Sequence, residues 1–433
     1  MNEQECKQYL ERIQSLGIKF GLDNVREILN AFQNPHRKFP SVLVAGSNGK
    51  GSVCAFLAQI FNLHGFRAGL FTSPHLVDVE ERIRIGEKLI PRQAFCRLLT
   101  QLRNNIDELI GAKKLLNPPT YFEHLSCLAF LYFAEQKVDI AFCEVGMGGR
   151  FDATNVVDPE VSVITTISAE HQKFLGESLS QIAFEKSGII KPGVPVVCGV
   201  RDQDAYTIIK KRAEELGCPF YGVFDKKENF GRQKTGAGYT FSFRMNGETY
   251  AYEPALPGKH QGRNAAVAIT VSRILGRRWK KLEKEKIIQA IQTTRWAGRL
   301  EVLSQKPLVL LDGAHNEEGA EALGDYIKEF APSPVVLVYA SMRDKKIERI
   351  AKALFPLAQR VILTRFPYYR ALPPEELAEK LAWSDRKIIC EQDAGKAFWM
   401  AKRLAGSGGT VVVAGSLFLI GEIKKMIRAP HSA

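Results

Sequence analysis

The sequence lacks the features that mark secreted, membrane-spanning and zinc-binding proteins. Its eight cysteines include no Cys-x-x-Cys pair and show no zinc-finger spacing. No uninterrupted apolar run approaches the roughly 18 residues of a membrane span. The first residues, Met-Asn-Glu-Gln-Glu-Cys-Lys, are polar and acidic, unlike a signal peptide. These absences predict a cytoplasmic protein whose cysteines are reduced, several of them in apolar segments.

Acidic residues are the minority among the charges, because 47 Asp and Glu stand against 60 Lys and Arg. The formal net charge of +13 admits nucleic acid, a membrane surface or an anionic small molecule as partner. No RNP-type aromatic motif accompanies the charge, so we expect small anions, and neither nucleic acid nor a membrane. A chain of 433 residues exceeds what one core usually serves, which predicts two domains. A monomer is expected.

Residues 41–52 predict a phosphate-binding loop. Residues 41–45 are a short apolar run with β-branched residues, which predicts a buried strand, and the apolar segment 53–61 predicts a helix. Between them lies Gly46-Ser-Asn-Gly-Lys-Gly-Ser52, here called the phosphate loop. A glycine-rich turn between strand and helix wraps backbone N–H groups around a phosphate.

Within the phosphate loop, Lys50 would face the outer phosphates of a nucleotide triphosphate, and the Ser52 hydroxyl would bind magnesium. The alternative is an ordinary strand-to-helix turn with an exposed lysine. The segment also departs from the common P-loop pattern, because Val44 stands where the first glycine belongs and Gly51 separates Lys50 from Ser52. By itself the loop therefore indicates a nucleotide without establishing one.

Strand and helix patterns alternate beyond this loop, which predicts a doubly wound, mostly parallel sheet. Residues 218–256 break the rhythm, and their alternating pattern around Asn246-Gly247 predicts a small antiparallel appendage. The expected strands are 41–45, 68–72, 138–145, 161–167 and 194–200, with 82–90 extended; the expected helices lie within 2–33 and at 53–61, 95–110, 121–134 and 179–187.

A second strand and helix series follows a helix-rich piece at 264–292. Its expected strands are 308–311, 335–339, 361–364 and 411–413. We therefore expect an α/β fold in which residues 1–296 form the phosphate-loop domain and residues 297–433 form a smaller, Rossmann-like α/β domain.

Polar side chains follow several of the expected strands, where ligands collect in open α/β sheets. Glu144 ends one strand, and Ser73 and His171 follow two others. Glu144 is where a magnesium carboxylate is expected, although a glutamate capping the next turn explains it as well. A lone histidine is more often structural, and magnesium prefers oxygen ligands, which weakens the case for His171.

The sequence pattern does not decide between a structural and a catalytic role at two further places. Asp312 and His315 close the first strand of the second domain, where a turn with local hydrogen bonds explains them as well as catalysis does. Lys186 lies in a helix among apolar residues, beside Glu185. It is either a salt-bridged or snorkelling lysine, or a desolvated nucleophile with a lowered pKa.

Nine segments together resemble the Mur-type ATP-dependent amide ligases, and among them the folylpolyglutamate synthase / dihydrofolate synthase family. They occur in the family's order and cover most of the chain. The segments are Gly46-Ser-Asn-Gly-Lys-Gly-Ser52, Ser73-Pro-His-Leu76, Glu144-Val-Gly-Met-Gly-Gly-Arg-Phe-Asp-Ala-Thr-Asn155, His171-Gln-Lys-Phe-Leu-Gly176, Ile182-Ala-Phe-Glu-Lys-Ser-Gly-Ile-Ile-Lys191, Leu256-Pro-Gly-Lys-His-Gln261 with Asn264, Gly298-Arg-Leu-Glu301, Asp312-Gly-Ala-His-Asn316 and Gly415-Ser-Leu-Phe418.

The resemblance implies a Mur-ligase-like fold and a set of ATP and metal ligands. The residues implied for ATP are Gly49, Lys50, Gly51, Ser52, Asn264, Arg299 and Asp312. The residues implied for two magnesium ions are Ser52, Ser73, Glu144 and His171. Lys186 matches the lysine that is carbamylated in the family, a change that turns a cation into an anion beside the metal ions.

The resemblance also implies the remaining substrates and their ligands. Lys50, Lys186, Asp312 and His315 would be catalytic. Asp312 and His315, with Ser416 nearby, would help close the site over ATP and glutamate, and Phe122 and Asp152 match positions that contact the pterin. Residues 1–296 would then bind ATP and folate, and residues 297–433 would bind glutamate. Closure is expected about residues 293–300.

The implied reaction is the ATP-dependent addition of L-glutamate to folates, and to dihydropteroate, through an acyl phosphate. Three departures from the family remove no reacting group: Ser47 for threonine, Glu170 for aspartate, and Ala297 for a proline. Two alternatives remain at this stage. One is a peptidoglycan-precursor ligase with the same ATP chemistry, and the other is an ATP-dependent switch without ligase activity.

Overall fold

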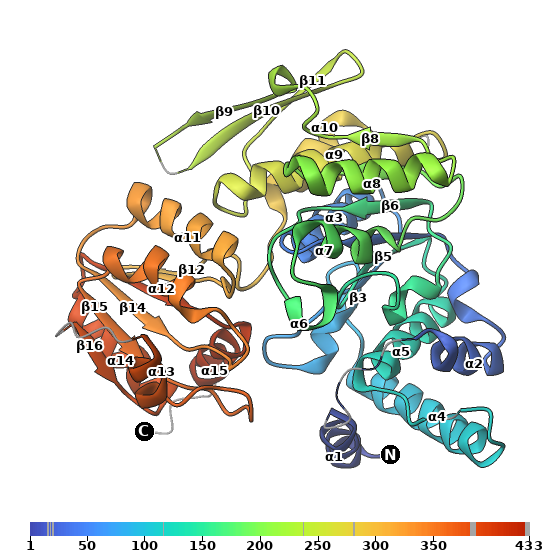
Figure 1. The fold of residues 1–433 in the computed structure, drawn as a ribbon, viewed down its shortest axis with the longest axis horizontal. Helices are drawn as coiled ribbons and strands as arrows, with labels where there is room; N and C mark the ends of the chain where they lie inside the picture. Colours follow the sequence, from blue (N-terminus) through green and yellow to red (C-terminus); the bar gives the residue numbers. More distant parts are fainter. Residues whose placement is uncertain are drawn as a thin grey trace.

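The structure is a computed structural model that describes residues 1–428 apart from 15–16, 18, 20, 116, 237, 280–281 and 382–386. Two lobes lie side by side, each built around a sheet of its own (Figure 1). The first lobe contains the elements from α1 to α10, and the second lobe those from β12 to α15. Together they form the two-domain α/β arrangement that the sequence predicts.

The sheet of the first lobe has eight strands in the order β4-β3-β2-β5-β1-β6-β7-β8. The strands from β2 to β8 in that order are parallel, and β3 and β4 add an antiparallel hairpin at one edge. The strands are β1 Ser41–Ala45, β2 Ala68–Phe71, β3 Ile83–Ile85, β4 Lys88–Leu89, β5 Ile140–Glu144, β6 Val161–Ile164, β7 Val196–Cys198 and β8 Phe220–Gly222.

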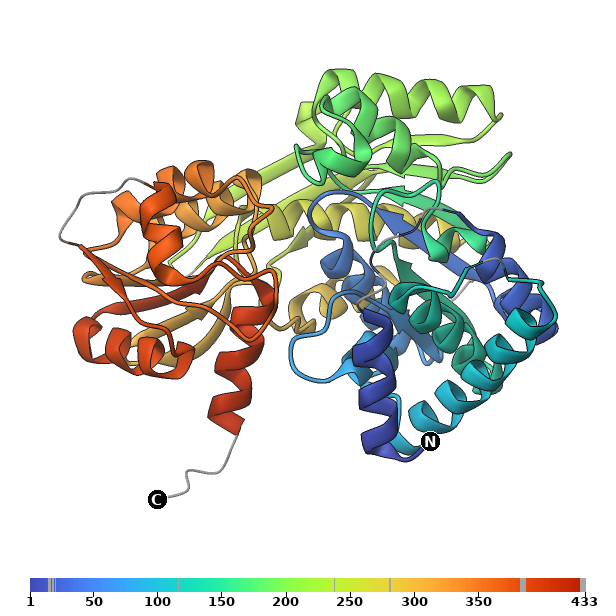
Figure 2. The ribbon, with the colours of Figure 1, turned by 60° about the horizontal axis from the view of Figure 1, so that its bottom comes forward.

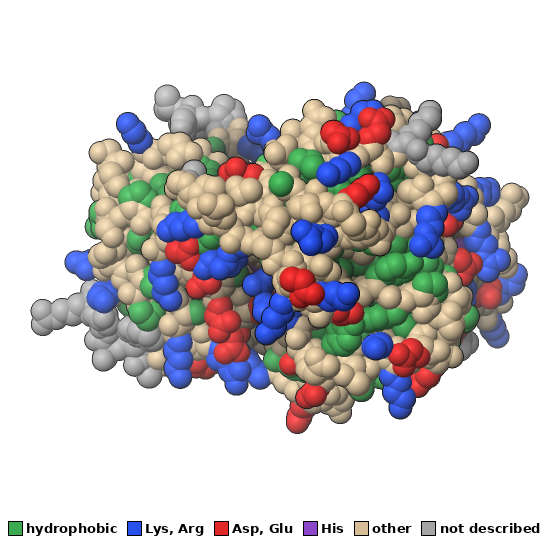
Figure 3. Space-filling model, turned by 90° about the horizontal axis from the view of Figure 1, so that it is seen from above, with side chains coloured by type: hydrophobic (Ala, Val, Ile, Leu, Met, Phe, Trp, Pro, Cys, Tyr) green, Lys and Arg blue, Asp and Glu red, His purple; other side chains and the backbone are tan. Residues whose placement is uncertain are grey.

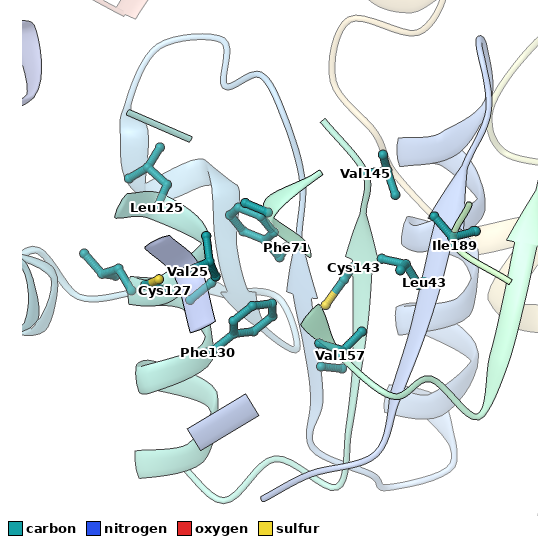
Figure 4. Close-up of a cluster of buried hydrophobic side chains, with 14 of the residues drawn as sticks. Val25, Leu43, Phe71, Leu125, Cys127, Phe130, Cys143, Val145, Val157 and Ile189 are labelled. Atoms are coloured by element: carbon teal, nitrogen blue, oxygen red, sulfur yellow. The ribbon is translucent and has the colours of Figure 1, made fainter. Parts of the chain in front are cut away.

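Side chains of the parallel strands alternate between two apolar cores, one on each face of the sheet. On β1, Leu43 and Ala45 enter one core and Val42 and Val44 enter the other. Figure 4 shows part of the first core, where Phe130 of α5 lies against the sheet. The helices on that face are α1 Glu3–Gln14, α2 Asp23–Ala31, α4 Arg92–Gly111, α5 Tyr121–Glu135, α7 Leu179–Ser187 and α8 Gln203–Glu215.

The opposite face is covered by three helices and the antiparallel appendage. The helices are α3 Lys50–Leu63, α9 Lys259–Leu275 and α10 Lys284–Thr293, and the appendage consists of β9 Phe230–Lys234, β10 Tyr239–Met245 and β11 Glu248–Tyr252. Asn246 and Gly247 have φ angles of 51° and 80°, as the predicted two-residue hairpin turn requires. None of the helices in the described part of the chain is long and apolar enough to cross a membrane.

The structure differs from the sequence expectations at several strand ends. The strand expected at 161–167 ends at Ile164, and the next two residues instead bind the phosphate loop: the Thr165 hydroxyl donates to the Asn48 carbonyl at 2.6 Å, and the Thr166 carbonyl accepts from the Ser47 N–H. The strand expected at 138–145 begins at Ile140, because the Val138 N–H donates to the carbonyl of Phe133 at the end of α5.

Other differences concern which elements exist. Part of the segment expected to form the appendage, β8, is instead a parallel edge strand of the large sheet. The appendage has a third strand, β9, whose partly or fully exposed residues give no clear alternation. The extended segment 82–90 is the β3–β4 hairpin, so the sheet is mixed at that edge.

The second lobe is built on a six-stranded sheet in the order β12-β13-β17-β14-β15-β16. All neighbours are parallel except β12 and β13, and the sequence pattern misses β12 because most of its residues are exposed. The strands are β12 Glu301–Gln305, β13 Leu308–Leu311, β14 Val335–Tyr339, β15 Arg360–Leu363, β16 Ile388–Cys390 and β17 Thr410–Ala414. The helices are α11 Glu317–Phe330, α12 Ile347–Leu354, α13 Pro374–Leu381, α14 Ala394–Ala405 and α15 Leu417–Arg428.

Two of the contacts between the lobes involve the Leu76 loop and the appendage. The Leu76 loop of the first lobe packs against α15, and a Cβ atom on Gly421 would collide with the Leu76 carbonyl. On the appendage side, Glu329 of α11 accepts hydrogen bonds from Tyr239 and Lys259. Figure 2 shows both lobes from a second direction, and Figure 3 shows Lys and Arg interspersed with Asp and Glu on the surface seen from above.

Candidate active site

A cavity of about 320 Å³ lies between the lobes at the carboxyl ends of the first lobe's parallel strands. Both lobes contribute to its walls, and most of the residues singled out from the sequence line it. These residues are Gly49, Lys50, Gly51, Ser52, Ser73, Glu144, His171, Asn264, Arg299, Asp312 and His315.

The phosphate loop is held against the end of β6 by hydrogen bonds. The Ser47 N–H donates to the Thr166 carbonyl at 2.8 Å, and the Asn48 N–H donates to the Thr166 hydroxyl at 3.0 Å. Gly46 has a φ of 146°, and a Cβ atom there would collide with the Thr165 hydroxyl. These contacts fix residues 46–48 in front of α3, which begins at Lys50. The backbone N–H groups at the start of a helix favour an anion.

Two glycines of the loop are required by close neighbours. Gly49 has a φ of 85°, and a Cβ atom on it would collide with the Asn264 side chain of α9. A Cβ atom on Gly51 would lie 3.1 Å from the Trp296 Nε1 and 3.3 Å from a Glu144 carboxylate oxygen. The glycine pattern that departs from the common P-loop thus fits the walls of this particular cavity.

Lys50 is folded back onto its own loop. Its ammonium donates to the Gly46 carbonyl at 2.8 Å and to the Ser47 carbonyl at 3.0 Å. Lys186 donates to the same Gly46 carbonyl at 2.9 Å, which places two cationic side chains on one oxygen. Of these two lysines, only Lys50 lines the cavity and could reach an anion there.

Glu144 and its neighbours have the donor chemistry of a magnesium site. Among the described residues, the Ser73 N–H is the only hydrogen-bond donor to Glu144, at 3.0 Å. Burial raises the pKa of Glu144, and the Lys50 ammonium opposes that shift. The carboxylate, with the Ser52 and Ser73 hydroxyls on the same cavity wall, fits a cation that prefers oxygen ligands.

His171 completes the set of metal ligands that the resemblance implies. It has a φ of 49° and begins the short helix α6, Gln172–Leu175, on the wall of the cavity. Burial lowers its pKa to about 4, so its imidazole is neutral at neutral pH and able to donate a lone pair. Within the described residues no group of three or more His, Cys, Asp and Glu side chains could hold a metal ion. A metal site here would therefore depend on the serine hydroxyls.

Lys186 is buried behind the phosphate loop and does not line the cavity. Only 2% of its side chain is exposed, and its ammonium forms an ion pair with Glu170 at 2.9 Å. Burial lowers the pKa of Lys186, while Glu170 opposes the shift. Burial alone would raise the pKa of Glu170, but the Lys186 ammonium holds it below its usual value.

The second lobe presents Asp312, His315 and the linker residue Arg299 to the cavity. Asp312 orders this segment, since it accepts from the Leu300 N–H at 2.7 Å and from the Ala314 N–H at 2.9 Å. The His315 Nδ1 lies 2.8 Å from the Gly313 carbonyl, so Nδ1 carries the hydrogen and Nε2 is left as an acceptor. Burial lowers the pKa of His315 to about 3, which keeps the ring neutral.

Three of the residues expected to bind substrates lie outside the cavity wall. Phe122 packs behind it, where a Cβ atom on Gly146 would be 2.7 Å from the ring. Asp152 accepts from the Met147 N–H at 3.0 Å and from Thr154. Ser416 is buried and accepts from the Phe418 N–H at 3.2 Å. The structure therefore places them as supports of loops near the cavity.

Several polar pairings in and around the site have no sequence signal of their own. Arg82 is buried, donates to the His75 ring at 2.9 Å and lies over the Tyr121 ring at 5.3 Å. Asn48 and Glu318 join the phosphate loop to the second lobe. These residues are far apart in sequence and carry no recognisable spacing, so only the folded chain reveals them.

Comparison with known proteins agrees with this geometry. Residues 44–272 match the Mur ligase middle domain, and residues 298–417 match the Mur ligase, glutamate ligase domain. The dihydrofolate synthase/folylpolyglutamate synthase of Bacillus subtilis is 34% identical over 429 residues, which cover 98% of this chain and 99% of that protein. The folylpolyglutamate synthase of Lacticaseibacillus casei is 31% identical over 438 residues, which cover 99% of each.

Solved structures of the same kind superpose over nearly the whole chain. The Mycobacterium tuberculosis folylpolyglutamate synthase complexed with ADP and AMPPCP has a TM-score of 0.90 and 27% identity, covering 99% of this chain and 100% of that one. The Escherichia coli FolC in complex with DHPP and ADP has a TM-score of 0.84 and 27% identity, covering 98% of each. The chain therefore belongs to the folylpolyglutamate synthase / dihydrofolate synthase family of Mur ligases.

Proposed function

We propose that this protein is an ATP-dependent ligase that joins L-glutamate to the carboxylate of a folate, and to dihydropteroate, forming ADP and phosphate. The observation that carries the proposal is the single cavity in which the phosphate loop of one lobe faces Asp312 and His315 of the other. That arrangement suits two substrates that must meet, one activated by ATP and the other an amine. The names of the similar proteins agree with these substrates.

The chemical problem is that a carboxylate is a poor acylating agent. In the proposed reaction a carboxylate oxygen of the folate attacks the γ-phosphorus of ATP, and the bond to ADP breaks. The acyl phosphate that results is attacked by the glutamate nitrogen, and the tetrahedral intermediate expels phosphate. Lys50, turned from its own loop carbonyls towards the phosphates, would stabilise the charge on the transferring group.

Magnesium would neutralise phosphate charge when bound, and Ser52, Ser73, Glu144 and His171 are the residues that would hold two ions. The amine of glutamate must be free of its extra proton before it attacks. The neutral His315 ring offers Nε2 as an acceptor for that proton, and Asp312 is the alternative candidate for this role. Asn264 and Arg299 would contact the nucleotide from the walls of the cavity.

The substrate assay is the direct test. We expect phosphate release from ATP that depends on both L-glutamate and a pteridine substrate, with dihydropteroate and tetrahydrofolate compared side by side. Release that needs a UDP-linked peptide would support the peptidoglycan-precursor alternative. Release that needs neither glutamate nor a pteridine would support the switch and contradict the ligase.

Lys186 is proposed to carry a carbamate when the enzyme is active. The reaction joins the neutral amine of Lys186 to carbon dioxide and releases a proton, and the lowered pKa of Lys186 favours the amine form. We expect Lys186→Ala to lose nearly all activity and to regain a measurable part of it with formate or acetate. A small carboxylate would replace the missing anion.

The matched control for this rescue is methylamine, which replaces an ammonium instead of a carboxylate. If methylamine restores Lys186→Ala and formate does not, Lys186 acts as the cation paired with Glu170 and the carbamate is wrong. Equal rescue by formate and chloride would show a general effect of anions and would contradict the specific role of a carbamate.

The two lobes are proposed to bind different substrates. Residues 1–296 would bind ATP and folate, residues 297–433 would bind glutamate, and closure about residues 293–300 would gate the reaction. Phe122 and Asp152 are proposed to contact the pterin, and Ser416 is proposed to bind substrate near Asp312 and His315. We also propose a monomer in the cytoplasm; eight free cysteines support a reducing compartment.

A further inference from the structure

Asn48, at the tip of the phosphate loop, hydrogen-bonds to the second lobe. Its Nδ2 donates to the Glu318 carboxylate at 2.5 Å, and its Oδ1 accepts from the Asn316 Nδ2 at 3.0 Å. The backbone of Asn48 is fixed to the first lobe, since its N–H and its carbonyl both bind hydroxyls at the end of β6. This side chain therefore joins the two lobes at the phosphate loop.

Glu318 is an anion built into the cavity wall beside that loop. It is the second residue of α11, and the Asn316 side chain accepts from the Gly319 N–H at 2.9 Å and caps this helix. A carboxylate in the first turn of a helix is stabilised by the helix dipole. The Thr166 hydroxyl is a second donor to it, at 3.5 Å.

Glu318 lies where its negative charge would repel the phosphates of a nucleotide. It lines the same cavity as the phosphate loop and Lys50, and like charges that share a cavity with limited water repel each other strongly. Burial lowers the pKa of Arg263, another residue of the cavity wall, and the Glu318 carboxylate opposes that shift. Glu318 and Arg263 therefore lie close enough on this wall for their charges to interact.

We propose that Glu318 sets the affinity of this site for ATP. Its carboxylate accepts the hydrogen bond from the Asn48 side chain and repels the phosphates of ATP. Nucleotide binding must therefore weaken the contact between Asn48 and Glu318. Glu318 is a positioning residue, because it acts through the phosphate loop and its charge. The inference rests on the proposed function, since it requires ATP on that loop.

The test is Glu318→Gln, which keeps the shape and the acceptor for Asn48 and removes the charge. Titration calorimetry with magnesium and AMPPCP should give a Kd about three- to tenfold lower than that of the wild type, the size expected for one partly screened charge. The KM for ATP should fall with it, while kcat and the KM for glutamate stay unchanged.

Glu317→Gln is the matched control. It makes the same charge change one residue earlier, where the carboxylate pairs with Arg349 at 2.6 Å and does not line the cavity. We expect its Kd for AMPPCP to remain within about twofold of the wild-type value.

Four results would overturn the inference. An unchanged or higher Kd in Glu318→Gln would show that the carboxylate does not oppose the nucleotide. An equal tightening in Glu317→Gln would assign the effect to overall charge. A raised KM for glutamate with unchanged nucleotide binding would assign Glu318 to the amino-acid ammonium. Wild-type protein that binds no AMPPCP would overturn the proposed function itself, and this inference with it.

Discussion

Replacing Lys50 with alanine should reduce glutamate-dependent ADP formation by about 10³-fold. The Lys50 ammonium is the cation of the phosphate loop, and in the structure it needs only to leave two carbonyls, at 2.8 and 3.0 Å, to reach an anion. Because its charge acts on the transferring phosphoryl group, most of the loss should appear in kcat. Steady-state measurement of ADP with all three substrates tests this.

The control for this variant is Lys38→Ala, which removes a lysine from an exposed position after the short helix that precedes β1. Its rates should equal those of the wild type. Thermal unfolding of Lys50→Ala should remain cooperative, which separates the loss of activity from a loss of the fold. Full activity in Lys50→Ala would contradict the role given to the phosphate loop.

Glu170→Gln should lower the free energy of unfolding by about 3–5 kcal/mol in buffer freed of carbon dioxide. The substitution leaves the Lys186 ammonium, 2% exposed, without its charged partner. Chemical denaturation at pH 7 measures the difference. The matched variant is Glu185→Gln, whose pair with Arg150 is more exposed and should contribute no more than about 1 kcal/mol.

The ion pair between Lys186 and Glu170 also predicts how the free energy of unfolding depends on pH. The Lys186 ammonium holds the folded-state pKa of Glu170 below its usual value, although burial alone would raise it. The contribution of Glu170 to stability is therefore present at neutral pH and is lost as the pH falls below about 4.3, where the unfolded chain binds the proton first. The difference in the free energy of unfolding between wild type and Glu170→Gln should become smaller over that acidic range. A difference that widens there would contradict the ion pair.

The parts of the fold that the sequence predicts well are those determined locally. The phosphate loop, the Asn246-Gly247 turn and the buried strands follow from residues that are neighbours in sequence, and the structure contains all of them. Edge strands such as β12 and β9 were missed because their side chains are largely exposed, and an exposed strand carries little apolar alternation.

The site was predictable to the extent that it repeats a family pattern. Eleven expected residues line one cavity, but their partners could not be anticipated. Asn48 and Asn316 are 268 positions apart, and Lys186 and Glu170 are 16 apart without a helix that joins them. Such pairs arise from tertiary packing, and no spacing rule for a single element describes them.

The absence of a side chain on Gly421 has a mechanical consequence. There the backbone of α15 rests directly on the Leu76 carbonyl, with no flexible atoms between them to absorb sliding. Any side chain at position 421 would therefore push α15 away from the Leu76 loop and misalign the two walls of the cavity, to which Ser73 and Arg299 belong.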